Sequence, residues 1–334
     1  EGDTDTAINW RHARTKALIC LACAAVIALP VLFGSWALER MELGLGDLLT
    51  DNRGGGTVDD KLVLIGIDKN SFNVLDVLDE EYVINNPVLD EMSFGKPFPR
   101  TVYAALTEKL LSAGARIVVF DIVFAGERQE DADFKAVLDA HPGKFVLASS
   151  FDFVEAVGDK DGVQRHDITL PSFTLLDQDD PMDQRVGFAN FSPDIDDRVR
   201  SMTPTHRPGD RDDSPVYHSM VYAALKQLGL GERISEPGRD YHMRFADFRA
   251  TPPPYSWMEM YTLFVETDWE NNYKGGAVFK DKIVYVGGIS IPDFHDVAEI
   301  PGAEILGVHL QMNALAAALN GEFYSVFTKR GQLL

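Results

Sequence analysis

The chain has little cysteine and an excess of acidic over basic residues. Its 334 residues include two cysteines, Cys20 and Cys23, and none after position 23. This absence excludes a disulfide scaffold, a zinc–thiolate site and a cysteine nucleophile from most of the chain. The sequence contains 31 Lys and Arg residues and 52 Asp and Glu residues, which gives a net charge of −21. Such a surface opposes binding to phosphate backbones, so we expect no nucleic-acid partner.

Several motifs of nucleotide-binding proteins and hydrolases are also missing. The sequence contains no Gly-x-Gly-x-x-Gly, no P-loop and no kinase or cyclase signature. The segment Gly287-Gly288-Ile289-Ser290 resembles a nucleophile elbow, but Pro292 stands where Gly-x-Ser-x-Gly requires glycine. We therefore expect no cofactor and no enzymatic activity in these residues. A metal-assisted hydrolase is a weaker alternative.

One long uncharged run stands near the beginning of the chain. Ala17–Leu38 comprises 22 residues without a charge, and a helix of that length spans about 33 Å, enough for a bilayer core of roughly 30 Å. Arg11, Arg14 and Lys16 precede it, which predicts a cytoplasmic N-terminus and a periplasmic or extracellular domain beyond the inner (plasma) membrane. A cleaved signal peptide, a lipoprotein signal and a buried soluble helix are the less favoured alternatives.

The rest of the chain divides by composition. Residues 39–58, with Gly54-Gly55-Gly56, are typical of a linker. Residues 59–321 alternate apolar runs with helical spacings, which predicts an α/β domain with a mixed, largely parallel sheet flanked by helices. Residues 322–334 lead toward a second membrane segment. The expected strands are Leu62–Ile67, Arg116–Phe124, Lys144–Ser149 and Lys282–Gly287, and the expected helices Thr101–Ala113, Asp131–Ala140, Val216–Leu228 and Gly302–Asn320, with a turn at 159–162 and a loop at 289–301.

Two long-range predictions follow from these patterns. Runs without polar alternation need cover on both faces, so we expect Lys282–Gly287 to join the sheet begun by Leu62–Ile67. The last helix carries a heptad-like stripe, which is either a core face or a dimer seam. We favour the core face, because the stripe is short. The stripe residues are Ile305, Val308, Met312, Leu315 and Leu319.

Six short motifs occur in a fixed order along the chain. They are IGIDKNS (65–71), FPR (98–100), AGARIVVFDIVF (113–124), VGFANFSPDIDDRVR (186–200), FKDKIVYVGG (279–288) and PGAEILGVHLQMNAL (301–315). In this order they resemble the type-2 CHASE domain, a bacterial sensory module, over roughly residues 40–321. Two motifs depart from the family pattern, because Asp197 stands where glycine is usual and Val308-His309-Leu310 stands where His-Ala is more common.

The resemblance implies an extracytoplasmic sensor with an unknown small ligand. It also implies further membrane helices and a nucleotide cyclase or kinase output domain in a longer protein. A structural or accessory subunit of a membrane complex is the alternative. Besides the lipid bilayer, the expected partners are a second copy of the chain or the members of such a complex.

Polar residues near the strand ends are the candidate ligand-binding residues. Parallel strands would gather them at one sheet edge, where α/β proteins bind ligands. The favoured alternative is that they cap helices and tie down loops. Arg100 would pair with an acid, for example Asp68 or Asp121, or hold an anionic ligand. The candidates are Asp68, Arg100, Asp121, Asp293, His295 and Asp296.

Overall fold

The computed structural model describes most of the chain as two units. It describes residues 14–21, 36–51, 54–154, 165–177, 182–208, 215–290 and 296–324. The first unit is Glu1–Gly54 with Asp194–Asp197, and the second is Gly55–Pro193 with Arg198–Leu334. The second unit contains both the first and the last expected strand of the α/β domain.

The first unit contains helices at 14–21 and at α2 (Trp36–Asp51). Among the residues described, no helix is both long and apolar enough to cross a membrane. The middle of the predicted transmembrane segment, residues 22–35, lies outside the described residues. The predicted linker, 39–58, is helical as far as Asp51, although glycines at 44 and 46 disfavour a helix.

The second unit is built on one mixed sheet in the order β10-β1-β11-β2-β3-β4, with β5 also beside β3. Every neighbouring pair is parallel except β3 and β4, which are antiparallel. The predicted α/β class with a largely parallel sheet is confirmed. The strands are β1 (Leu62–Ile67), β2 (Ile117–Asp121), β3 (Phe145–Val154), β4 (Arg165–Thr169), β5 (Val186–Phe188), β10 (Trp257–Glu259) and β11 (Ile283–Gly288).

Strand β11 lies between β1 and β2, which joins the two ends of the domain sequence. Leu62 pairs with Ile283, and Ile283 pairs with Ile117. The predicted union of the last strand with the first is therefore confirmed. Successive residues point to opposite faces of the sheet, so the central strands β1, β11, β2 and β3 each contribute to two apolar cores.

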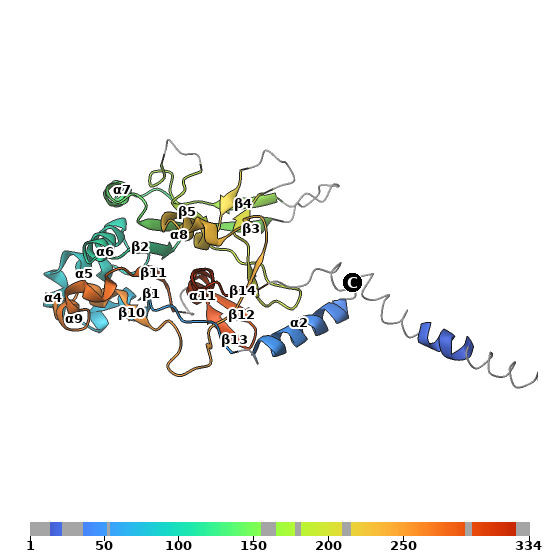
Figure 1. The fold of residues 1–334 in the computed structure, drawn as a ribbon. Coiled ribbons are helices and arrows are strands. Elements are labelled where there is room, and N and C mark those ends of the chain that lie inside the picture. The colour runs from blue at the N-terminus through green and yellow to red at the C-terminus, as the bar shows by residue number, and fades with distance from the viewer. Residues whose placement is uncertain are drawn as a thin grey trace, which may run out of the picture. The chain divides into compact units, whose positions relative to one another are not determined.

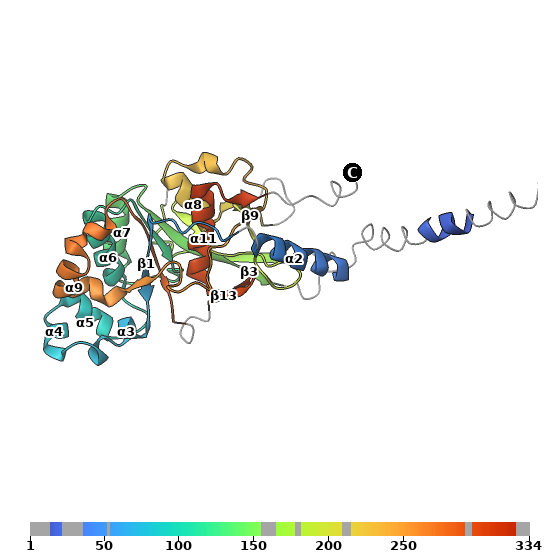
Figure 2. The same cartoon turned by 60° about the horizontal axis from the view of Figure 1, so that its bottom comes forward.

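Helices cover both faces of the sheet (Figure 1). One core contains residues of α5 (Pro87–Ser93), α6 (Arg100–Ser112) and α7 (Asp131–Ala140). The other core contains residues of α8 (Met220–Gln227) and α11 (Gly307–Asn320), which lie side by side in Figure 2. Burial of both faces explains the uninterrupted apolar runs of the central strands.

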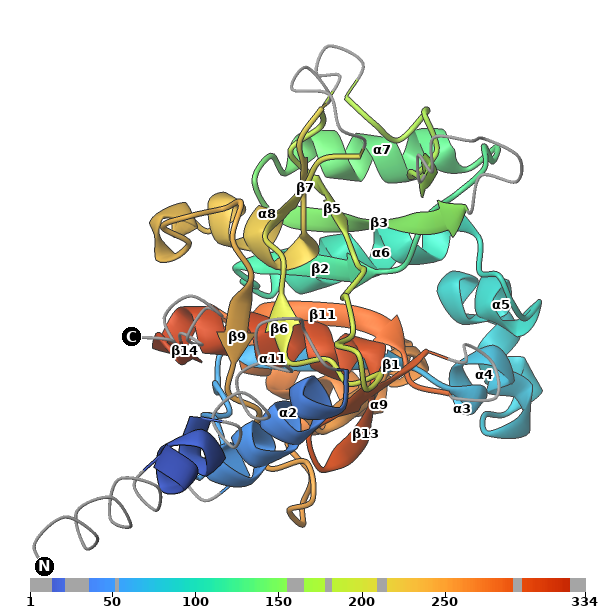
Figure 3. The same cartoon turned by 90° about the vertical axis from the view of Figure 1, so that its right-hand side faces the viewer.

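Helix α11 lies across β11 (Figure 3) and begins five residues later than predicted, at Gly307 instead of Gly302. The preceding residues form an antiparallel hairpin of β12 (Val297–Ile300) and β13 (Ala303–Leu306). Gly302 turns the chain with φ of 81°, a conformation that glycine adopts without strain. The prediction of a plain loop over 289–301 is therefore wrong for β12, because a strand this short and half-polar has little periodicity.

The stripe of α11 is a core face. Val308, Met312 and Leu315 of α11 are buried, as is Ile305 in β13, and Leu319 is partly buried against the same cluster. The interpretation as a dimer seam is therefore wrong, because these side chains already pack inside the domain.

The remaining elements are short. The helix expected from Val216 begins at Met220, where the Ser219 hydroxyl accepts a bond of 3.2 Å from the Tyr222 amide. The turn expected at 159–162 lies outside the described residues. The short elements are α3 (Lys69–Phe72), η1 (Val74–Asp76), α4 (Glu80–Ile84), β6 (Ser201–Met202), β7 (Thr205–His206), β8 (Tyr217–His218), η2 (Gly231–Arg233), β9 (Tyr241–Met243), η3 (Met260–Phe264), α9 (Glu266–Asn271), η4 (Lys274–Phe279) and β14 (Phe323–Tyr324).

Candidate functional site

The carboxyl ends of four parallel strands meet at one edge of the sheet. In the order β10, β1, β11, β2 they bring Glu259, Asp68, Gly288 and Asp121 to that edge. Strand β11 separates Asp68 from Asp121, so these two residues do not form one cluster. The edge instead carries two separate pairs of carboxyl groups.

The first pair is Asp121 and Asp296. Asp121 ends β2 and is half-buried. Burial, and then the negative charge of Asp296, raise the pKa of Asp121 from 3.8 to about 7. Burial of its carboxyl group also raises the pKa of Asp296, although the residue as a whole is exposed. No basic side chain among the described residues contributes to the pKa shift of either acid.

Helix α11 begins beside this pair. The Gly307 amide donates to the Asp296 backbone carbonyl at 3.1 Å. A Cβ atom at position 307 would lie only 2.2 Å from Oδ2 of Asp296, so glycine is needed for this contact. The N-terminal amides of a helix favour a negative charge, and no side chain caps this end of α11. The Asp296 carboxyl group therefore packs against the first residue of α11.

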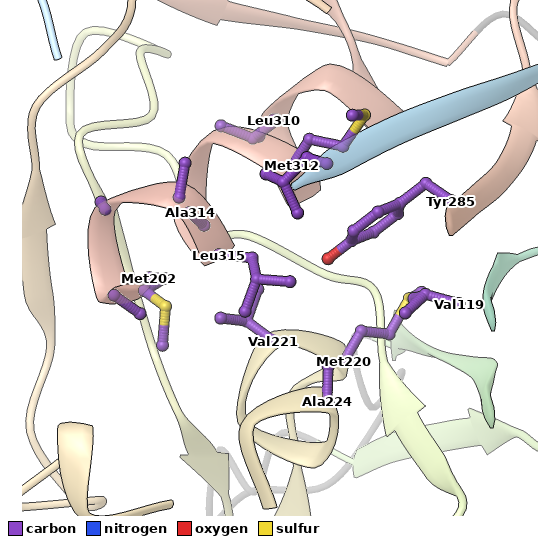
Figure 4. Close-up of a cluster of buried hydrophobic side chains, with 14 of the residues drawn as sticks. Val119, Met202, Met220, Val221, Ala224, Tyr285, Leu310, Met312, Ala314 and Leu315 are labelled. Atoms are coloured by element: carbon purple, nitrogen blue, oxygen red, sulfur yellow. The ribbon is translucent and has the colours of Figure 1, made fainter. Parts of the chain in front are cut away.

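Tyr285 lies two residues before Gly287 in β11, and its side chain points to the same face of the sheet as that of Asp121 in β2. Its hydroxyl group is fully buried and has no hydrogen-bond partner among the described residues. Burial, and then the charge of Asp121, raise the pKa of Tyr285 well above 10. Figure 4 shows the hydroxyl directed into the apolar cluster formed by α8 and α11. The sequence analysis did not single out Tyr285. The one feature that could have indicated it is a tyrosine within an otherwise aliphatic strand.

Two further buried polar groups lie on the same side of the sheet. The hydroxyl of Tyr255 and Nε2 of His309 also lack a partner among the residues described. Their rings are 6.4 Å apart, and Phe248 lies 6.0 Å from His309. Burial lowers the pKa of His309, and a hydrogen bond with the Tyr255 backbone partly offsets this decrease. The imidazole is therefore held neutral within an aromatic cluster.

The second carboxyl pair is Asp68 and Glu259. Asp68 caps α3 by accepting bonds from the Ser71 amide at 2.8 Å and the Ser71 hydroxyl at 2.7 Å. Asn70 Nδ2 donates to Glu259 Oε1 at 2.9 Å. Burial, and then the neighbouring Asp68 carboxyl, raise the pKa of Glu259. Asp68 thus has the capping role of the favoured alternative, and Glu259 is a neighbour that the sequence did not indicate.

Arg100 forms a buried ion pair with Asp131 instead of Asp68 or Asp121. Its Nε donates to Asp131 Oδ1 at 3.1 Å, with only 5% and 2% of the two side chains exposed. The guanidinium also donates to the Ala125 carbonyl at 3.2 Å and lies 4.8 Å from the Phe124 ring centre. Asp131 accepts further bonds from the Arg128 amide and the Thr174 hydroxyl. Arg100 therefore joins α6 to the loop before α7 and serves the fold.

The other sequence candidates do not add to the edge. Asp293 and His295 lie outside the described residues. The acidic segment Asp194–Asp197 is a turn in which the Asp197 amide donates to the Asp194 carbonyl at 3.0 Å. Asp197 has φ of 64°, which explains why glycine suits this position. Within the described parts of the chain, no group of three His, Cys, Asp or Glu side chains is arranged to hold a metal ion.

Comparison with known proteins identifies the class. The CHASE2 domain family model matches residues 21–334, so the chain belongs to the CHASE2 domain family. CHASE2 domains are sensory domains of receptors, which supports a sensor role for this α/β unit. No curated protein and no solved structure matches the chain significantly.

Proposed function

We propose that this chain is the signal-input part of a membrane-anchored bacterial receptor. Membership of the CHASE2 family and the 22 uncharged residues of Ala17–Leu38 support an anchored sensor. The basic residues before this run support a cytoplasmic N-terminus and an extracytoplasmic α/β unit. A nucleotide cyclase or a kinase is the output that the family resemblance implies.

A labelling experiment tests the topology. Cysteines replace Arg14 or Asp133 in a chain whose native cysteines are changed to serine. In intact cells with a permeable outer barrier, an impermeant thiol reagent should label position 133 and not position 14. Labelling of position 133 only after membrane disruption contradicts the proposal.

We propose further that Asp121 and Asp296 form the ligand site and that the ligand is a small organic ammonium ion. The observation that carries this proposal is the position of the two acids at the start of α11. A Cβ atom on Gly287 would lie 2.9 Å from Val308 and 3.3 Å from Asp121, and one on Gly307 would meet the Asp296 carboxyl group. Burial raises the pKa of both acids. An ammonium group placed between them would supply the missing charge and donate hydrogen bonds to both carboxylates.

The position of the pair suggests how binding would reach the fold. Asp121 belongs to the sheet, whereas Asp296 contacts the first residue of α11. A cation that attracts both carboxylates would favour the arrangement in which α11 stays close to β2. A signal requires that the ligand bind two arrangements of the domain with different affinities. Without a cation the two carboxylates repel each other and favour a wider separation, whereas the cation binds more tightly when they are close.

Thermal unfolding of the chain at pH 7 with putrescine as the probe tests the site. Putrescine should raise the unfolding temperature, and Asp121→Asn should abolish the increase. The control Asp133→Asn removes an exposed carboxylate from α7 and should retain the increase. An increase with calcium chloride alone, or none with putrescine at millimolar concentration, contradicts the ammonium site. A structural or accessory subunit would likewise show no putrescine response.

A further inference from the structure

Helix α2 presents a row of exposed apolar side chains. Met41, Leu45, Leu48 and Leu49 are 63%, 60%, 59% and 62% exposed. Their spacings of four, three and one place them on one side of an α-helix. Side chains this apolar are rarely left in water as a contiguous row, so the row marks a contact surface.

The spacing of the row fits a two-helix seam. With Met41 at d and Leu45 at a, Leu48 falls on the next d position of a heptad. Gly44 takes the g position and Leu49 the e position, which face each other between two parallel helices. A Cβ atom on Gly44 would meet nothing within 4 Å, so its place is open to Leu49 of a second helix.

The charges of α2 favour another protein helix over a lipid surface. The helix contains Glu39, Glu42, Asp47 and Asp51 against a single base, Arg40. Helices that lie in a membrane interface usually carry Lys and Arg on the polar side, which attract anionic headgroups. In a parallel pair, the g–e contact within the described part of α2 would join Gly44 to Leu49, and neither residue carries a charge.

We infer that α2 is a homodimerisation helix, and that its exposed apolar row packs in parallel against the same row of a second copy of this chain. Two heptads alone bind weakly, so the rest of the chain supplies the high local concentration that holds the pair together. The inference uses a surface separate from the carboxyl pairs and does not depend on the identity of the ligand.

Disulfide cross-linking of the full chain in membranes tests the arrangement. Met41→Cys, Leu45→Cys and Leu48→Cys are introduced singly, with Cys20 and Cys23 changed to serine. All three should form covalent dimers under mild oxidation, whereas Gly46→Cys, on the other side of α2, should not. Self-linking at both 41 and 48 requires a parallel pair. Equal cross-linking at 46, or cross-linking at none of the positions, overturns the inference.

A second measurement separates the dimer from a lipid contact. The detergent-solubilised chain should sediment as a dimer, and Leu45→Glu should give a folded monomer with unchanged circular dichroism. The matched control Gly46→Glu adds the same charge in open space and should leave the dimer intact. A monomeric wild-type chain whose cysteines at 41, 45 and 48 are protected by liposomes would assign the row to lipid and overturn the inference.

Discussion

Gly287 of β11 and Val308 of α11 touch so closely that a Cβ atom at position 287 would lie 2.9 Å from Val308 Cγ2. The same atom would lie 3.3 Å from Cβ of Asp121. The missing side chain at Gly287 thus lets the first turn of α11 rest on the sheet beside the end of β2. This contact fixes the position of the helix relative to the proposed ligand site.

Adding one methyl group at Gly287 should force this contact apart. We expect Gly287→Ala to lower the free energy of unfolding by about 1–3 kcal/mol, because a well-packed core resists extra volume. Denaturant unfolding measures the change. The control Gly238→Ala adds the same methyl group where nothing lies within 4 Å and should change stability little. Equal effects of both changes would show that the contact is looser than described.

The raised pKa of Asp121 makes stability depend on pH. Its pKa rises from 3.8 to about 7 in the folded chain, so between these values the folded state binds the proton that the unfolded state releases. This residue's contribution to stability therefore falls as pH rises from about 4 to 7. Asp121→Asn should stabilise the chain at pH 8, on the order of a few kcal/mol.

Unfolding of both proteins at several pH values checks this prediction. The gain from Asp121→Asn should shrink as pH falls and disappear near about pH 3, below the ordinary pKa of 3.8, where Asp121 is mostly protonated in both states. Asp133→Asn should show no comparable trend. A constant difference between wild type and Asp121→Asn at every pH would mean that the carboxyl group is not desolvated.

The sheet was predictable from the sequence because its strands are buried on both faces. The strand Leu62–Ile67 and the helix Asp131–Ala140 were predicted with the bounds that the structure shows. The β12–β13 hairpin was not, because Val297–Ile300 and Ala303–Leu306 are short and mixed in polarity. Local periodicity is weak in such segments, and their pairing is set by tertiary contacts.

The candidate site was predictable only in part. Strand ends indicated Asp68 and Asp121, since parallel strands place their carboxyl ends at one edge. The sequence did not indicate that Glu259 would lie beside Asp68, because β10 has only three residues. The Arg100–Asp131 pair joins residues 31 positions apart, and several acids nearby in sequence were equal candidates.

Removing one partner of the Arg100–Asp131 pair should be costly. Asp131→Asn would leave the guanidinium of Arg100 buried without its counter-charge, which typically costs about 3–5 kcal/mol. Lys135→Ala removes one half of an exposed pair with Asp139 and should cost under about 1 kcal/mol. Urea titration of the two variants gives both values. Similar small losses would mean that water reaches Arg100.

The backbone at Asp197 predicts which residues it tolerates. Its φ of 64° lies in a region where residues other than glycine are strained by about 1–3 kcal/mol, with Asp among the better tolerated. Asp197→Gly should therefore leave stability within about 1 kcal/mol of wild type. Asp197→Val should destabilise the chain by more, and thermal unfolding separates the two. A harmless valine would contradict the left-handed turn.

Burial of Leu315 decides how α11 responds to a charge. Leu315 is fully buried in the core formed with α8, so Leu315→Asp would place an unpaired carboxyl group among apolar side chains. Loss of the leucine side chain alone typically costs about 2–5 kcal/mol, and desolvation of the new acid adds to that. We expect the variant to lose the cooperative unfolding transition and much of its helical circular dichroism. The control Asn320→Asp adds the same charge at the exposed last residue of α11 and should remain folded. A folded Leu315→Asp variant that has merely become monomeric in sedimentation would place the helix in an interface between chains, contrary to the structure.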